Sequence, residues 1–268
     1  MNHYEFIHLS DLHLGKTSVE RRRIVTLFAH IAKHLPNRPV LITGDLTESA
    51  KDSQFKGMEQ LVTSLAATNP VLCMPGNHDY AWHGFAFDSG AWDKWVKYLG
   101  SPMGWPSPEP GPWMGGALPT SPFEGLGFRQ VGDCLLIGID SGDPGNKVHT
   151  AKGYISQELA NALRAYLDAH PAKVRIALLH HHPITWKSLF TGLVGRDRLI
   201  AALRDRCEVL LFGHHHEAGI WHDTDGIPLM CASHKSTDYI SGRCLMYGLL
   251  TVDTGAEPPC NYRMVLAQ

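Results

Sequence analysis

The chain has 268 residues, of which 44% are apolar and 19% charged, so it can bury a sizeable core and is not globally disordered. Its 24 basic and 26 acidic residues give a formal net charge of −2, which argues against a broad basic surface for nucleic acid or anionic lipid. Histidine is frequent, with 17 copies, and imidazole is both a proton carrier near neutral pH and a common metal ligand.

The N-terminal segment lacks the basic and apolar regions of a signal peptide, and no stretch reaches the roughly 18 apolar residues of a membrane-spanning helix. We therefore expect a cytoplasmic protein without a membrane partner. The length allows one large domain, so residues 1–268 are interpreted as a single domain.

Short apolar runs predict strands, and apolar residues spaced three and four apart predict amphipathic helices. In chain order, the predicted strands are Tyr4–Leu9, Pro39–Thr43, Pro70–Met74, Asp133–Ile139, Val174–Leu179, Glu208–Phe212, Ile227–Ala232 and Cys244–Val252. The predicted helices lie around residues 24–35, 55–65, 159–167 and 196–206. Strand and helix alternate in the first half and strands dominate the last third, which favours central sheets packed between helices.

A Trp- and Pro-rich region at about 82–127 interrupts this alternation. Five of the seven tryptophans lie between Trp82 and Trp113, and seven prolines lie between Ser101 and Pro122. We interpret the region as an irregular insertion within the domain. Its tryptophans could cover a pocket, pack on a second copy of the chain or anchor the loop to its own core, so a homo-oligomer is one of the alternatives.

Five of the predicted strands are followed directly by residues that bind metals. The following sequences are Asp11-Leu12-His13, Gly44-Asp45, Gly76-Asn77-His78-Asp79, His180-His181-His182-Pro183 and Gly213-His214-His215-His216. Ligands of open α/β sheets bind beyond the carboxyl ends of the strands, so these loops are expected to converge. Their alternate-residue spacing suits two metal ions. A ligand set without sulfur favours Mn, Fe, Zn, Ni or Co over Cu(I) or an iron–sulfur cluster, and the absence of cysteine here excludes a structural zinc finger.

These motifs match a known family. The series Asp11-x-His13, Gly44-Asp45-x-x-Glu48, Gly76-Asn77-His78-Asp79, His181-x-Pro183 and Gly213-His214-x-His216 closely resembles the calcineurin-like metallophosphoesterases. The resemblance implies a four-layer αββα sandwich of the metallo-dependent phosphatase type. A softer resemblance, carried by Asp140-Ser141 and the stretch from Gly153 to Leu159, is to the class III cyclic-nucleotide and glycerophosphodiester phosphodiesterases.

The family's roles imply two metal ions held by two ligand sets that share one carboxylate. The ligands would be Asp11, His13 and His216 for one ion, Asn77, His181 and His214 for the other, and Asp45 as the bridge. His181 is assigned because the family pattern places a ligand two residues before the proline, although the residues alone do not separate it from its neighbours in the run. His78 would face the phosphate, while Glu48 or Asp79 would orient neighbouring groups.

Two divalent ions and two aspartates would leave a positive centre that attracts phosphate, and water between two metals loses its proton near neutral pH. We therefore expect hydrolysis of a small phosphodiester, such as a cyclic nucleotide or a glycerophosphodiester, by attack of a metal-bridging hydroxide. Asp45 and His78 would be the catalytic residues, with His78 stabilising charge or donating a proton to the leaving oxygen.

Three other functions are alternatives. A DNA exonuclease or endonuclease of the same superfamily fits the opening Ser10–Lys16, but the near-neutral charge argues against a nucleic-acid partner. A phosphomonoesterase would use the same ligands. A scaffold that has lost catalysis is disfavoured because all seven ligand positions are filled.

Overall fold

The structure is a computed structural model that describes residues 2–82, 86–87, 90–100, 125–142, 151–184, 190–240 and 244–267. Side chains at 82, 86 and 87 lie outside the described set. Most of the Trp- and Pro-rich region therefore also lies outside it, including residues 101–124.

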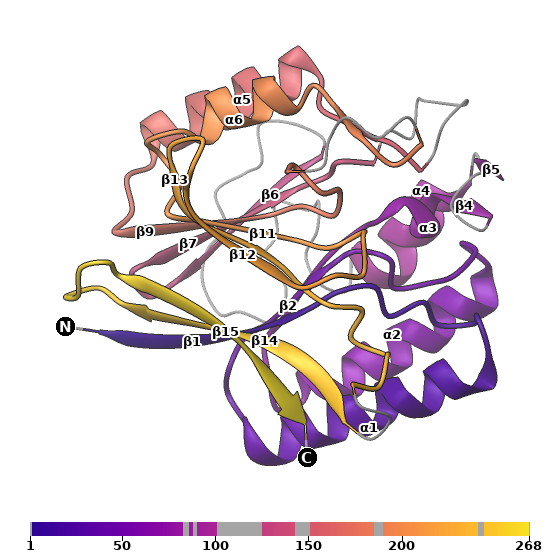
Figure 1. Ribbon diagram of the computed structural model, residues 1–268. Coiled ribbons are helices and arrows are strands. Elements are labelled where there is room, and N and C mark those ends of the chain that lie inside the picture. Colours follow the sequence, from indigo (N-terminus) through magenta and orange to yellow (C-terminus); the bar gives the residue numbers. More distant parts are fainter. Residues whose placement is uncertain are drawn as a thin grey trace.

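Two β-sheets form the centre of the molecule (Figure 1). The first has the strand order β15-β14-β1-β2-β3, and the second has the order β12-β13-β11-β9-β7-β6. The strands of the first sheet are β1 (His3–Leu9), β2 (Val40–Thr43), β3 (Val71–Met74), β14 (Leu245–Asp253) and β15 (Cys260–Ala267). Those of the second are β6 (Leu126–Val131), β7 (Cys134–Ile139), β9 (Val174–Leu178), β11 (Val209–Phe212), β12 (Gly219–Thr224) and β13 (Ile227–Ala232).

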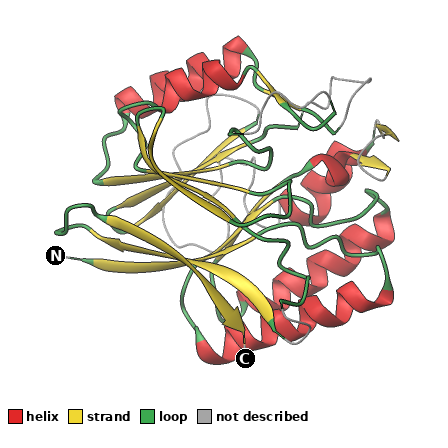
Figure 2. Ribbon diagram, viewed as in Figure 1, coloured by secondary structure: helices red, strands yellow, loops and turns green. Residues whose placement is uncertain are grey.

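Helices cover the outer face of each sheet, which confirms the predicted αββα arrangement (Figure 2). Helices α1 (Ser18–His34) and α2 (Asp52–Ala66) lie against the first sheet, and α5 (Gln157–Ala169) and α6 (Arg196–Leu203) lie against the second. One apolar core includes the inner faces of both sheets, and a second core lies between the second sheet and its helices.

In helices α1 and α5 an apolar stripe coincides with a side-chain cap at the N-terminus. In α1, the buried stripe is Ile24, Leu27, Phe28 and Ile31, and the Thr17 side chain accepts a hydrogen bond from the Val19 amide. In α5, Ser156 accepts from the Leu159 amide at 3.0 Å, and such a cap contributes about 1 kcal/mol. Each fully buried leucine or phenylalanine adds about 1.5–3 kcal/mol, so the stripes contribute more than the caps.

The eight predicted strands are all present. Besides several two-residue strands, the structure adds three longer strands that were not predicted, β6, β12 and β15. Strands β6, β12 and β15 each lie at a sheet edge. An edge strand pairs with a neighbour on one side only. In β12 every residue is exposed or half-buried, so this strand lacks a continuous apolar run.

Several shorter elements complete the described chain. They are α3 (Asn77–Tyr80), β4 (Ala81–Trp82), β5 (Ala86–Phe87), α4 (Ala91–Trp95), the π-helical turn η1 (Val96–Gly100), β8 (Gly153–Tyr154) and β10 (Leu193–Val194). Residues 91–100 were expected to be irregular, but they are helical because Trp95 and Leu99 are fully buried in the first core.

Parallel pairing brings the carboxyl ends of the strands together. Strand β1 pairs in parallel with β2, and β2 with β3, while β7, β9, β11 and β13 are parallel neighbours in the second sheet. The loops that follow β1, β2, β3, β9 and β11 therefore meet at one edge of the sandwich. Among the described helices, none is both long and apolar enough to cross a membrane.

Candidate metal centre

Backbone hydrogen bonds join the loops that follow the strands. The Asp11 amide donates to the Gly44 carbonyl at 3.1 Å, and the His13 amide donates to the Asp45 carbonyl at 2.9 Å. Across the two sheets, the His214 amide donates to both carboxylate oxygens of Asp11, at 3.3 and 3.2 Å. The predicted convergence of residues about 200 positions apart is therefore a feature of the backbone itself.

The backbone is unusual at the predicted ligands. Ten described residues other than glycine have a left-handed φ, and five of them are Asp11, His13, Asp45, His214 and His216, with φ between 50° and 77°. Asp and His tolerate this region better than most residues, yet each instance costs on the order of 1 kcal/mol or more. Such strain persists only where the surroundings impose it, and it is concentrated here at one edge of the sandwich.

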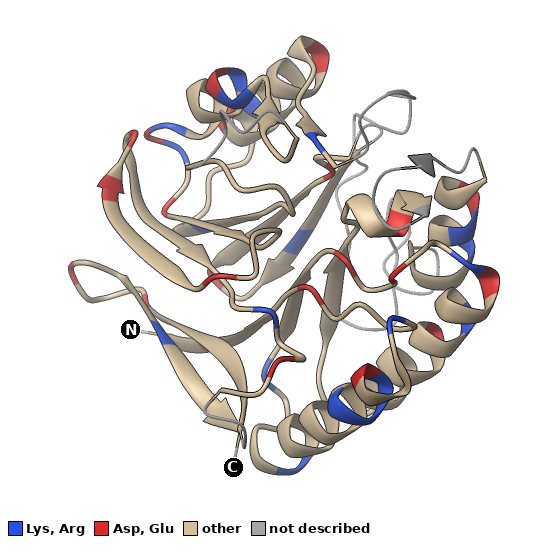
Figure 3. Cartoon of the chain, turned by 45° about the vertical axis from the view of Figure 1, so that its right-hand side comes forward, with Lys and Arg blue, Asp and Glu red and all other residues tan. Residues whose placement is uncertain are grey.

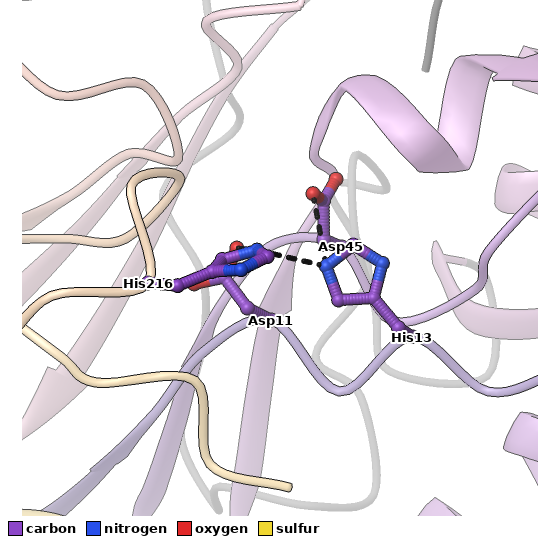
Figure 4. Close-up of side chains that lie close together, drawn as sticks. All are labelled: Asp11, His13, Asp45 and His216. Carbon is purple, nitrogen blue, oxygen red and sulfur yellow. Dashed lines mark hydrogen bonds and ion pairs between the residues drawn. The ribbon is translucent and has the colours of Figure 1, made fainter. Parts of the chain in front are cut away.

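A first cluster forms around Asp11, His13, Asp45 and His216 (Figure 4). The two Nε2 atoms of His13 and His216 lie 3.1 Å apart. His13 Nε2 is 3.6 Å from Asp45 Oδ2, and His216 Nε2 is 3.4 Å from Asp11 Oδ1. One ligand atom from each of the four residues lies within 4.8 Å of the others, a spacing that fits a single small cation.

Glu48 holds the ring of His13. Its Oε2 lies 2.9 Å from His13 Nδ1, and because a carboxylate only accepts, Nδ1 carries the proton and Nε2 presents a lone pair to the cluster. Burial lowers the pKa of His13 despite this hydrogen bond, which favours the neutral ring that a metal ion requires. The role of Glu48 in orienting a neighbour follows the sequence expectation.

A second cluster forms on the other side of Asp45. His180 Nε2 lies 3.0 Å from Asn77 Oδ1, 3.2 Å from His214 Nδ1 and 3.4 Å from Asp45 Oδ2. His180 is fully buried and Asn77 is 4% exposed. The Oδ2 atom of Asp45 therefore approaches imidazole nitrogens of both clusters, those of His13 and His180.

His181, the ligand expected in the histidine run, lies elsewhere in the structure. Its Nδ1 is 2.9 Å from Ser141 Oγ, and its Nε2 is buried without a hydrogen-bond partner among the described residues. The reason is strand alternation, because Val174, Ile176 and Leu178 face the inner core and His180 continues that face. The prediction placed the ligand two residues before Pro183 and did not use this alternation, although the sequence contains it.

In the second cluster, the hydrogen bonds of two histidines leave two ring nitrogens facing each other without a proton between them. His180 Nδ1 lies 2.8 Å from the Thr43 carbonyl, and His214 Nε2 lies 3.1 Å from the Thr191 carbonyl, so both of these nitrogens must donate. In the neutral rings, His180 Nε2 and His214 Nδ1 then face each other with lone pairs. A cation between them resolves the conflict, so the donor set fits a metal ion.

The electrostatics of the two clusters agree with this assignment. Burial opposes ionisation of Asp45, but His180 and His78 outweigh it and hold the pKa of Asp45 well below its usual value. For His180, burial opposes the charged form, while Asp45 and Asp11 raise its pKa to about 9. At neutral pH, His180 Nε2 therefore keeps a proton unless a metal ion takes its place.

His78 and Asp79 lie beside the two clusters. The His78 amide donates to Asp45 Oδ1 at 2.9 Å, and its Nδ1 donates to the Glu48 carbonyl at 2.8 Å, which leaves Nε2 available to a ligand. Asp79 is fully buried and accepts hydrogen bonds from the amides of Leu46, Thr47 and Gly76. Asp79 therefore joins the loops after β2 and β3, while burial and Asp45 raise its pKa to about 6.

Two motif glycines allow this close packing. A Cβ on Gly44, whose φ is +91°, would lie 2.4 Å from His180 Nδ1, and a Cβ on Gly76 would lie 2.3 Å from Asp45 Oδ1. Both positions thus require glycine for the histidine and the aspartate to occupy their places. Sequence reasoning did not anticipate Thr191, which holds His214, because a main-chain carbonyl makes the contact and no spacing pattern marks it. Ser141 belongs to the Asp140-Ser141 motif noted in the sequence, and the structure adds its contact with His181.

Solved structures with the same fold include several phosphoesterases and related proteins. A calcineurin-like phosphoesterase from Bacillus subtilis, YfkN, is 12% identical with a TM-score of 0.54, and the match covers 98% of this chain and 90% of that one. GAP50, described as the anchor in the inner membrane complex of Plasmodium, is 13% identical with a TM-score of 0.61, covering 100% and 86%. At these identities the likeness establishes the fold alone.

A putative 5'-nucleotidase from Staphylococcus aureus is 11% identical with a TM-score of 0.57, and the match covers 99% of this chain. The chain spans about half the length of that protein, 54%. Comparison with curated protein sequences gives no significant match. The profile of the calcineurin-like phosphoesterase family matches residues 4–218, which include every ligand loop described above. The chain therefore belongs to the calcineurin-like phosphoesterase family.

Proposed function

We propose that the protein is a dinuclear-metal phosphodiesterase that hydrolyses a small phosphodiester, such as a cyclic nucleotide or a glycerophosphodiester. The observation that carries the proposal is that one buried carboxylate, Asp45, lies between two separate groups of nitrogen and oxygen ligands. A shared carboxylate is the arrangement expected of two metal ions that act on one phosphate.

The proposed ligands differ from the sequence expectation at one position. They are Asp11, His13 and His216 for the first ion, Asn77, His180 and His214 for the second, and Asp45 for both. His180 replaces His181 because its Nε2 lies within 3.4 Å of the other three ligand atoms of the second cluster. His181 then lies behind the ligands and supports them through Ser141.

Bound divalent ions would supply the positive charge that polarises the phosphate and activates water. The chain's own residues position that charge, since Glu48 and the carbonyls of Thr43 and Thr191 fix the ligand imidazoles. His78 directs its free Nε2 away from Glu48, and its side chain is 18% exposed. We assign it to hold the phosphate and to donate a proton to the leaving oxygen.

Charge distribution supports a small substrate. The net charge is −2, and Figure 3 shows basic and acidic segments interspersed over the outer helices and the loops. A polynucleotide substrate would require a continuous basic track along its backbone. Ser141 also supports the class III branch, because this residue of the Asp140-Ser141 motif lies directly behind the second cluster.

The test is a panel of metals and substrates. The purified chain would be loaded separately with Mn, Fe, Zn, Ni or Co and assayed on cyclic nucleotides, glycerophosphodiesters, phosphomonoesters and oligonucleotides. We expect turnover of a small diester that disappears with a chelator and returns with added metal. Faster turnover of monoesters or oligonucleotides than of every small diester would overturn the proposal.

A further inference from the structure

An exposed aromatic residue lies next to the second cluster. Phe190 is 72% exposed, whereas the other large apolar residues exposed in the described chain are between 41% and 46% exposed. The adjacent residue, Thr191, provides the carbonyl that accepts a hydrogen bond from the ligand His214 at 3.1 Å. Phe190 is therefore one peptide unit from a group that touches the metal centre.

The segment that carries Phe190 is firmly attached to the site. Gly192 accepts a hydrogen bond from the Gly153 amide at 3.0 Å, and Val194 accepts from the Ile155 amide at 2.9 Å. Leu193 is 1% exposed and belongs to the core between the second sheet and its helices. The backbone that follows Phe190 is thus fixed, while Phe190 itself is largely exposed.

We propose that Phe190 determines substrate specificity by stacking on a planar ring in the organic part of the phosphodiester. This inference rests on the proposed function, and it narrows the substrate class to diesters that carry a nucleobase or an aryl group. The second cluster is made of polar ligands, so an exposed aromatic side chain one residue from Thr191 would supply the apolar contact that they lack. Stacking on an aromatic side chain tolerates different bases, since each base has a π-face.

The experiment compares Phe190→Ala with the unchanged protein, both loaded with the same metal. Three substrates are used: a cyclic nucleotide, bis(4-nitrophenyl) phosphate and a glycerophosphodiester without a ring. We expect kcat/KM to fall roughly tenfold for substrates with a ring, as expected for the loss of one stacking contact, and to change little for the glycerophosphodiester. Phe190→Tyr should restore most of the loss, and the two ring substrates show whether a nucleobase or a simple aryl group is preferred.

Val25→Ala is the matched control, because Val25 is 46% exposed on α1 and should leave all three substrates unchanged. Metal content and thermal unfolding of both variants establish that the centre and the fold are intact. An equal change on all three substrates, or no change on any, would overturn the role of Phe190. Failure of the unchanged protein to hydrolyse any diester would instead reject the proposed function itself.

Discussion

The two ligand clusters are built from similar residues, but they are supported in different ways. In the first cluster a carboxylate, Glu48, orients the ring of His13 at 2.9 Å. In the second cluster neutral main-chain carbonyls, those of Thr43 and Thr191, orient His180 and His214. The first cluster also has a carboxylate of its own, Asp11, whereas the shared Asp45 is the one carboxylate that the described residues place at His180.

The clusters differ in access to solvent as well. The His216 side chain is 38% exposed, while the His180 side chain is fully buried. More negative charge favours a divalent cation, so the first cluster should bind its ion more tightly, although that ion is the more accessible one. Similar ligands can therefore give two unequal sites when the groups behind them differ in charge.

Asp45 is the residue that unites the two clusters, so its substitution should have the largest effect. Asp45→Asn removes the shared charge, and we expect loss of both ions and a fall of activity to background. Elemental analysis of the purified variant and a phosphodiesterase assay measure these effects. Retention of both ions with full turnover would show that Asp45 is not shared.

His78 tests whether a residue beside both clusters acts without binding metal. His78→Ala should lower turnover by roughly 10²–10⁴, the range for loss of a general acid, because the donor to the leaving oxygen is gone. Both ions should remain bound, since the described contacts of its ring are with Glu48 and His13. Loss of metal in this variant would count against the assigned role.

His180 and His181 distinguish the structural assignment from the one based on the sequence pattern. His180→Ala should remove the ion of the second cluster and retain the first, because only His180 contacts Asn77, His214 and Asp45 together among the described residues. The neighbouring His181→Ala is the matched control and should keep both ions. Loss of the second ion from His181→Ala, with both ions retained in His180→Ala, would instead identify His181 as the ligand.

Substitution of Glu48 tests whether the two clusters are supported by different groups, and its expected effect is the smallest of the four. Glu48→Gln keeps the size of the side chain but removes its charge, and loss of such a partner typically lowers metal affinity about 10- to 100-fold. The weakening should be confined to the first cluster, where Glu48 contacts His13. Equal weakening of both ions in a metal titration would mean that the clusters are not supported independently.

Much of this arrangement could be predicted from the sequence. Apolar runs predicted the central strands, and the residues after β1, β2, β3, β9 and β11 indicated where the loops would meet. Strand β12 was missed because none of its residues is buried, so it lacks a continuous apolar pattern. The choice between His180 and His181 depends on which face of β9 each side chain continues, a property that a motif counted from Pro183 does not encode.

Support of the ligands was the least predictable feature. Thr43 and Thr191 act through main-chain carbonyls, which any residue possesses, so no side-chain pattern reveals them. The role proposed for Phe190 likewise rests on its exposure and on its place next to Thr191, and no motif marks it. Contacts made by the backbone become visible only when the loops are placed in space.

Two metal ions that share Asp45 would be detected most directly by a Mn²⁺ titration followed by electron paramagnetic resonance. We expect two Mn²⁺ ions per chain, with unequal affinities, and a spin-coupled spectrum once the second site is filled. One ion per chain, or two ions that retain the spectra of isolated Mn²⁺, would contradict a shared dinuclear centre.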